Sequence, residues 1–347
     1  MQEKVLVGMS GGVDSTLSVS LLKDKGYEIA GVNCLFCPDK STLLDVSDAE
    51  EAATRMGVPF HVFDLRKEFA ENVIGNFITT YECGGTPNPC IICNKHLKFG
   101  AMLDKALEMG FDFIATGHYA RIEFDEEKSR YLLKKGLDEK KDQSYFLYTL
   151  TQHQLSHTLF PLGSMTKHEV RAMAEDFGLI NAKKRDSQDI CFIPDGDYVK
   201  FIQIRSGKAY PKGSFVDVYG NILGEHQGII NYTVGQRKGL GIALGKPAFV
   251  KKINPGNNTV TLCNNEELFS RELTAKNINL ISVGAITEPI RIKAKIRYRH
   301  EAQWATAIQE DEDTIRVLFD EPQRAITKGQ AVVLYDGDTV VGGGEIM

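Results

Sequence analysis

The chain has 347 residues, of which 42% are apolar and 25% charged, and its formal net charge is −5 at pH 7. This length exceeds what one hydrophobic core usually covers, so we expect two or three domains. The acidic balance excludes a global attraction to nucleic acid, and any site for it has to be a local basic patch.

Targeting signals and cysteine content bear on the compartment. No apolar run approaches the length of a membrane span, and the N-terminus lacks a basic-then-apolar signal. Seven cysteines without such a signal favour a reducing environment over a disulfide framework. We therefore expect a cytoplasmic protein with no membrane partner. A lone cysteine is usually a small buried hydrophobe, as we expect for Cys34 and Cys263.

A glycine-rich loop lies between the first apolar run, 5–7, and a segment with leucines at helical spacing. Two adjacent glycines let backbone N–H groups approach an anion, and serines at a helix N-terminus add hydroxyl donors. A carboxylate here repels phosphate unless it holds a cation, so Asp14 favours a functional loop over an ordinary turn. The lysine-bearing pattern G-x-x-x-x-G-K-S/T is missing, which disfavours γ-phosphate transfer. The loop residues are Gly8, Met9, Ser10, Gly11, Gly12, Val13, Asp14 and Ser15.

From Met1 to about Arg205 the pattern alternates between strands and helices. Strands are predicted over 29–36, 59–65 and 111–116, and helices over 47–56, through Phe69 and Phe77, and over 95–109 and 166–177. In the last of these helices, Thr166 and Glu169 have the spacing of a capping box and Gly178 ends the helix. Alternation with short links predicts a doubly wound parallel sheet.

Beyond Arg205 the segments become short and are separated by turn sequences. Residues 255–258, Pro-Gly-Asn-Asn, predict a turn between strands over 250–253 and 259–262. A second change falls near Arg271, after which alternating strands and an Asp336-Gly337 hairpin turn suit a small β-barrel. We predict three domains: an α/β catalytic domain over 1–205, a small, mainly β central domain over 206–271 and a C-terminal barrel over 272–347.

Two cysteines, Cys90 and Cys93, follow a proline-containing loop over 86–89. We expect Cys93 at the start of a helix and near Lys95, where the pKa of its thiol is lowered. Cys191 follows a basic run at 183–185, and the sequence by itself does not bring it to Cys93. A pair with Cys-x-x-Cys spacing also fits a structural zinc site, but a fourth nearby ligand is missing.

A strictly alternating segment, 291–300, carries five cations on one face of a predicted strand. A row of like charges without an acid among them favours a phosphate-binding surface over a merely solvated face. These cations are Arg291, Lys293, Lys295, Arg297 and Arg299.

The glycine-rich loop resembles the SGGxDS loop of the PP-loop ATP pyrophosphatase families, whose domain is adenine nucleotide alpha hydrolase-like. With further motifs in the same order, the chain resembles the bacterial-type tRNA-specific 2-thiouridylase family over essentially its full length. These motifs are Gly8 to Ser15, Thr86 to Pro89 with Cys93 to Lys95, Ala115 to Arg121, Lys141 to Tyr145, Ile190 to Ile193, Tyr232 to Gly241 and Arg297 to Arg299.

The resemblance implies roles for particular residues. ATP is expected at Gly8 to Ser15, Cys34 and Gly117, and the flipped target base at Asn88, Pro89 and Cys90. Cys191 is expected to receive a persulfide sulfur from a donor protein, with Cys93 as the partnering nucleophile. Positions that match tRNA-contacting positions of the family are His118, Lys141, Asp142, Gln143, Arg297, Tyr298 and Gln330.

The implied reaction is ATP-dependent thiolation of wobble uridine 34 in tRNA, with Lys, Glu and Gln acceptors expected. ATP, with Mg²⁺, adenylates the C2 oxygen and releases pyrophosphate; the persulfide then delivers sulfur to C2 and AMP leaves. The remaining S–S bond is reduced by the second thiol, which leaves a Cys93–Cys191 disulfide for a cellular reductant.

One position departs from the family pattern, because Cys90 stands where an aspartate with an assigned acid–base role is common. Three cysteines, Cys90, Cys93 and Cys191, leave open a second route through a 4Fe–4S cluster. Two other classes of function remain: a small-molecule ATP ligase with the same loop, and a non-catalytic tRNA- or metal-binding module. Neither explains both the cysteines and the intact loop.

Overall fold

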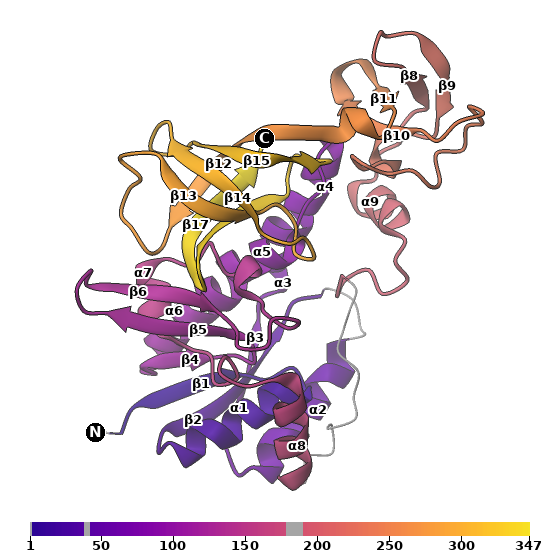
Figure 1. Cartoon of the computed structure of the whole chain (residues 1–347). Coiled ribbons are helices and arrows are strands. Elements are labelled where there is room, and N and C mark those ends of the chain that lie inside the picture. The colour runs from indigo at the N-terminus through magenta and orange to yellow at the C-terminus, as the bar shows by residue number, and fades with distance from the viewer. Residues whose placement is uncertain (1, 38–41, 178–189) are drawn as a thin grey trace.

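The structure is a computed structural model, and it describes residues 2–37, 42–177 and 190–347. Figure 1 shows a helix-covered sheet, a barrel above it and a smaller strand-rich unit to one side. Gly178 and the basic run 183–185 lie outside the described residues. Within the described part, no helix combines the length and apolar character that crossing a bilayer requires.

The N-terminal layer is a parallel sheet in the order β3-β2-β1-β4-β7. Its strands are β1 (Lys4–Gly8), β2 (Glu28–Leu35), β3 (Phe60–Asp64), β4 (Phe113–Ala115) and β7 (Thr158–Leu159). Val5 and Val7 pack with α1 (Val13–Asp24) and α2 (Thr42–Arg55), whereas Leu6 packs into the opposite cluster. Alternate residues of β1 are therefore buried on both faces, which confirms the doubly wound sheet.

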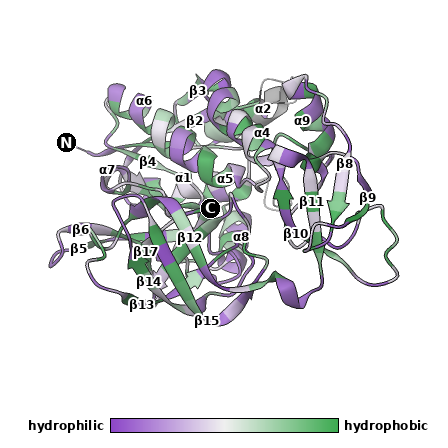
Figure 2. Cartoon of the chain, turned by 90° about the horizontal axis from the view of Figure 1, so that it is seen from above, coloured by the Kyte–Doolittle hydropathy of each residue, from purple (hydrophilic) through white to green (hydrophobic). Residues whose placement is uncertain are grey.

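Two long helical segments follow β3 and precede β4. The first comprises α3 (Arg66–Glu68), the π-helical η1 (Phe69–Ile74) and α4 (Gly75–Glu82). The second comprises α5 (Pro89–Cys93), the π-helical η2 (Asn94–Ala101) and α6 (Met102–Glu108). We predicted that this helix begins at Lys95, but it begins at Pro89. Proline is well suited to the first turn of a helix. α5 lies between the sheet layer and the barrel (Figure 1; Figure 2).

Several further elements follow β4 in the chain, up to Ser206. They are the antiparallel strands β5 (Ala120–Asp125) and β6 (Arg130–Lys135), and η3 (Ser144–Phe146), α7 (Gln152–Ser156), α8 (Lys167–Asp176) and α9 (Tyr198–Ser206). Thr166 and Glu169 form the predicted capping box of α8. Strand β6 pairs with the last barrel strand through Lys134 and Thr339, so the hairpin joins the two domains.

The central unit is a four-stranded sheet in the order β10-β11-β8-β9. Its elements are β8 (Gly213–Val216), β9 (Ile222–His226), η5 (Ile229–Asn231), β10 (Phe249–Asn254), η6 (Pro255–Asn257), β11 (Thr259–Cys263) and η7 (Glu266–Leu268). The predicted turn at 255–258 joins β10 to β11, with Asn258 in the left-handed region at φ +50°.

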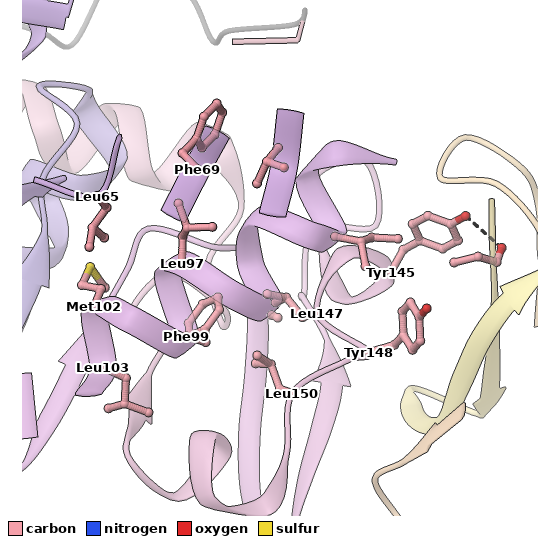
Figure 3. Packing of buried hydrophobic residues seen from close by; sticks show 14 of the residues in the cluster. Leu65, Phe69, Leu97, Phe99, Met102, Leu103, Tyr145, Leu147, Tyr148 and Leu150 are labelled. Carbon is pink, nitrogen blue, oxygen red and sulfur yellow. Dashed lines mark hydrogen bonds between the residues drawn. The ribbon is translucent and has the colours of Figure 1, made fainter. Parts of the chain in front are cut away.

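The C-terminal unit is a closed barrel, because β12 pairs with both β15 and β17. Its strands are β12 (Phe269–Leu280), β13 (Ile290–Lys295), β14 (Gln303–Gln309), β15 (Ile315–Arg324), β16 (Ala331–Asp336) and β17 (Thr339–Ile346). Tyr145 of the N-terminal layer reaches the barrel, and its hydroxyl donates to the carbonyl of Ala331 at 3.0 Å (Figure 3). The core is thus continuous between these two units.

Candidate active site

The glycine-rich loop is folded as a cradle between β1 and α1. The Ser10 N–H donates to Ser15 Oγ at 3.2 Å, and that hydroxyl donates to the Gly12 carbonyl at 3.0 Å. Gly11 has φ +69°, and a Cβ there would lie 2.8 Å from Cβ of Asp48. Gly12 is the N-cap of α1 and has no side chain with which to cap the first amides of the helix. This arrangement suits an anion.

The other residues expected to contact the nucleotide lie around this loop. Gly117 follows β4, and a Cβ there would lie 2.9 Å from Cβ of Asp14, so only glycine allows this close packing. Cys34 lies near the carboxyl end of β2 and packs against the core. Met9 and Val13 are buried, which makes them supports of the loop. The expected set therefore gathers at the carboxyl edge of the parallel sheet, the usual place for a ligand in this architecture.

Asp14 has a cationic partner that the sequence analysis missed. The ammonium of Lys167 lies 2.8 Å from Oδ1 and 2.7 Å from Oδ2 of Asp14. The hydroxyl of Tyr119 donates to Oδ1 at 3.1 Å. The only sequence signal for Lys167 was its position directly after the predicted N-cap Thr166. Nothing in the pattern connected that position to a loop more than a hundred residues earlier.

The cysteines expected to carry sulfur come together in the fold. The rings of Phe36 and Phe192 lie 5.6 Å and 5.5 Å from the ring of Phe69, so the residues that follow Phe36 and precede Phe192 converge on one place. The thiols of Cys93, Cys90 and Cys37 all act electrostatically on the thiol of Cys191. Cys34 and Cys93 interact in the same way.

The prediction of a lowered pKa for Cys93 is wrong. Partial burial raises the pKa of the half-buried Cys93 thiol to about 11. Loss of solvent around the thiols also raises the pKa of Cys191 and of Cys90, although both residues are exposed at the surface. Cys93 is the last residue of α5 and not the first of a helix, so the helix N-terminus does not act on its thiol. The cation that partly opposes burial at Cys93 is Lys98 and not Lys95.

The thiols do not form a metal centre in this structure. Among the residues that the structure describes, no group of three or more histidine, cysteine, aspartate or glutamate side chains is arranged to hold a metal ion. Cys90, Cys93 and Cys191 are all among those residues. The placement of these three thiols therefore gives no support to the 4Fe–4S cluster.

The loop expected to surround the target base is held by the barrel. The amide of Gln330 donates to the carbonyl oxygens of Thr86 at 2.9 Å and Pro87 at 3.2 Å. The Thr86 N–H in turn donates to the Lys328 carbonyl at 2.8 Å. Asn88 and Pro89 follow directly, and Pro89 is buried at the start of α5. Gln330 is thus placed to position the loop that leads to Cys90.

Several residues expected to contact tRNA have structural partners. Oδ1 of Asp142 accepts from the N–H groups of Gly136 and Ser144 at 3.1 Å and 3.0 Å. The side-chain oxygen of Gln143 accepts from the Tyr119 N–H at 2.9 Å. Lys141 is half-buried, and its N–H donates to the Asp138 carbonyl at 2.9 Å.

His118 is also inside the protein. It is 9% exposed, its ring packs against both Phe99 and Phe160, which also contact each other, and Nδ1 is 2.7 Å from the Thr116 hydroxyl. Burial, assisted by the positive charge of Lys98, holds the pKa of His118 well below its usual range. The imidazole is therefore neutral at pH 7.

The basic segment is not one row of five solvated cations. β13 ends at Lys295, and Nη1 of Arg291 donates to Oδ1 of Asp320 on β15 at 2.6 Å. Arg297 points inward and donates to the Ala325 carbonyl and, at 3.0 Å, to the Thr327 hydroxyl. The alternation of residues along the segment gives no information about the acid that pairs with Arg291 or about the inward direction of Arg297. Lys293 and Arg299 are exposed.

Tyr298 faces the N-terminal layer. Its ring lies 4.3 Å from that of Phe146 and 6.2 Å from that of Tyr145, and the Lys295 ammonium lies 5.5 Å from its centre. This aromatic contact belongs to the junction between the barrel and the sheet layer.

Three family models match consecutive parts of the chain. They describe a tRNA methyl transferase HUP domain over residues 3–195, a tRNA methyl transferase PRC-barrel domain over 199–264 and an aminomethyltransferase beta-barrel domain over 270–346. The first of them alone covers more than half of the chain.

Curated relatives match over the whole length. The chain is 52% identical over 355 residues to the tRNA-specific 2-thiouridylase MnmA of Clostridioides difficile (strain 630), covering 100% of this chain and 98% of that protein. It is 51% identical over 356 residues to the protein of the same description from Acetivibrio thermocellus, covering 99% of each. A solved U34-tRNA thiolase NcsA from Methanococcus maripaludis, with its 4Fe–4S cluster, shares 18% identity at a TM-score of 0.38, covering 58% of this chain and 67% of that one. That likeness is too low to bear on the sulfur route.

Proposed function

Because the chain belongs to the tRNA-specific 2-thiouridylase family, we propose that it uses ATP to replace the C2 oxygen of wobble uridine 34 in tRNA with sulfur. It is a tRNA sulfurtransferase. The observation that carries the mechanism is the convergence of Cys191 on Cys93 and Cys90, in a chain that also carries a loop shaped for phosphate. A small-molecule ATP ligase would need the loop but not the thiols.

The first step is activation of the base. The amides of the Gly11–Ser15 turn and the N-terminus of α1 hold the phosphates of ATP. The C2 oxygen of the uridine attacks the α-phosphorus, pyrophosphate leaves, and an adenylated base results. Mg²⁺ would be held at this loop by Asp14, whose two carboxylate oxygens also contact Lys167, and it would offset the negative charge of the phosphates.

The second step moves sulfur. The terminal sulfur of a Cys191 persulfide attacks C2 and AMP leaves, which joins the base to Cys191 through an S–S bond. The sulfur of Cys93 then attacks the Cys191 sulfur of that bond, which releases 2-thiouridine and leaves a Cys93–Cys191 disulfide. A thiol reductant must open that disulfide, and a persulfide-bearing donor protein must reload Cys191. The placement of Cys90, Cys93 and Cys191 gives no support to a route through a 4Fe–4S cluster.

Cys90 gives this chain a different group beside the base. The raised pKa of its thiol makes it a poor base at neutral pH, so we assign it no proton-accepting role. We propose that Cys90, Asn88 and Pro89 shape the pocket for a flipped uridine, with Gln330 holding their loop. The acceptors we propose are the tRNAs for Lys, Glu and Gln. We also propose domain boundaries near residues 205 and 271.

The test is sulfur incorporation into unmodified tRNA, measured with ATP, Mg²⁺ and a persulfide donor, in air and without oxygen. We expect Cys93→Ser and Cys191→Ser to be inactive and Cys90→Ser to retain substantial activity, with no iron needed by the wild type. Iron in the wild type, together with loss of both iron and activity in Cys90→Ser, would reinstate the cluster route. AMP formation that is independent of tRNA and gives no thiolated product would favour the ligase.

A further inference from the structure

The closest charged contact of the nucleotide loop is the one between Asp14 and Lys167. The ammonium lies within 2.8 Å of both carboxylate oxygens, and the two side chains are 28% and 9% exposed. The same ammonium lies 5.6 Å from the centre of the Tyr119 ring. Ordering and desolvating a long lysine side chain costs free energy, and here the contacts with the carboxylate offset that cost. These contacts fix the position of the ammonium.

Helix α8 fixes this ammonium beside the start of α1. Lys167 is the first residue of α8, and the capping box of Thr166 and Glu169 sets where that helix begins. Val170 and Ala174 of α8 belong to one buried cluster with residues of α1. The lysine is therefore delivered by a packed helix and not by a flexible loop.

The position of the Lys167 ammonium offsets the repulsion between Asp14 and a bound phosphate. Asp14 is in the first turn of α1, where the uncapped amides favour an anion, yet its own negative charge repels phosphate. An ammonium in contact with the carboxylate cancels that repulsion. It also adds a cation at the edge of the phosphate cradle.

We propose that Lys167 is a nucleotide-binding residue whose ammonium bridges Asp14 and the pyrophosphate part of ATP. This inference rests on the proposed function, because it requires ATP at this loop. The ammonium of Lys167 then neutralises the charge of Asp14. It contacts the β- and γ-phosphates and not the AMP part of the nucleotide.

The experiment is calorimetric titration of the full chain, without tRNA, with ATP, pyrophosphate and AMP as separate ligands. For Lys167→Met we expect affinity for ATP and pyrophosphate to fall about tenfold or more, as for loss of one charge-assisted hydrogen bond. AMP affinity should change by less than about twofold, because AMP lacks the phosphates concerned. Lys167→Arg should recover most of the loss. Lys4→Met is the matched control, since Lys4 pairs with Glu28 on the same sheet, where both side chains are about half exposed.

Unchanged affinity of Lys167→Met for ATP and pyrophosphate would overturn the inference. An equal loss for AMP would also overturn it, since that indicates a general disturbance of the loop. Thermal unfolding checks the variants, and if Lys167→Met does not fold, Lys167→Gln keeps a hydrogen bond to Asp14 and is read in the same way. A wild type that binds ATP but does not thiolate tRNA would contradict only the proposed function.

Discussion

The side-chain amide of Gln330 donates a hydrogen bond of 2.9 Å to the carbonyl oxygen of Thr86, across the junction between the barrel and the sheet layer. Thr86 precedes the segment that we assign to the target base and that leads to Cys90 and Cys93. The barrel therefore holds the loop that leads to the residues proposed for the base pocket and for sulfur transfer.

We expect Gln330→Met to slow thiolation roughly tenfold, because two hydrogen bonds to the loop are lost and its geometry loosens. Affinity for ATP should stay unchanged, because the nucleotide loop is on another element. Gln303→Met is the control, since the Gln303 amide makes only a local contact, with Glu301, in the same barrel. Equal thiolation rates for Gln330→Met and the wild type would show that the loop needs no support from the barrel.

Much of the fold followed from local pattern, and the reasons are visible in particular residues. The alternation of Val5, Leu6 and Val7 between two clusters, and the capping box at Thr166, depend on neighbours within a few positions. The partners of Asp14 and Arg291 come from distant elements, and periodicity carries no information about them. The motifs predict which residues form the site, but the charge partners of those residues depend on tertiary contacts.

A π-helical stretch explains one misjudged neighbour. We expected Lys95 to act on Cys93, but the cation that acts on the Cys93 thiol is Lys98. Residues 94–101 form a π-helix, in which hydrogen bonds join residues five apart. The local sequence carries no signal that predicts a π-helical stretch at this place.

The raised thiol pKa values predict slow and strongly pH-dependent alkylation. With its pKa near 11, Cys93 should react with iodoacetamide about tenfold faster for each pH unit between 8 and 10, because only the thiolate attacks. Lys98→Met should slow Cys93 further, since Lys98 lowers that pKa, whereas Lys95→Met should not. Mass spectrometry of the Cys93 peptide measures both rates. Fast, pH-independent labelling of Cys93 above pH 7 would contradict the burial we describe.

His118 predicts a loss of stability in mild acid. Its pKa in the folded chain lies well below the usual 6.5, so between those two values the unfolded chain binds a proton that the folded chain does not. The free energy of unfolding therefore falls as pH drops below about 6.5, by up to about 1.4 kcal/mol per pH unit from this group.

His118→Phe should remove that part of the slope while keeping an aromatic ring packed against Phe99 and Phe160. Urea unfolding of both proteins at pH 7, 6 and 5 measures the difference. Other histidines titrate equally in the two proteins, so they cancel in the comparison. Parallel stability curves for wild type and variant would mean that the pKa of His118 is the same in the folded and unfolded chains, which would contradict its burial as a neutral ring.

The exposed and the inward-pointing cations of the barrel predict different effects when they are replaced. Lys293 and Arg299 are exposed, so Lys293→Ala with Arg299→Ala should weaken tRNA binding and lower the salt slope by about 1 to 2, as released counterions are lost. Arg297→Ala should instead lower the melting temperature, because Arg297 holds the Ala325 carbonyl and the Thr327 hydroxyl inside the junction. Fluorescence anisotropy over a salt series and thermal unfolding separate the two effects. A salt slope that stays unchanged in the double variant would show that this face of the barrel is only solvated.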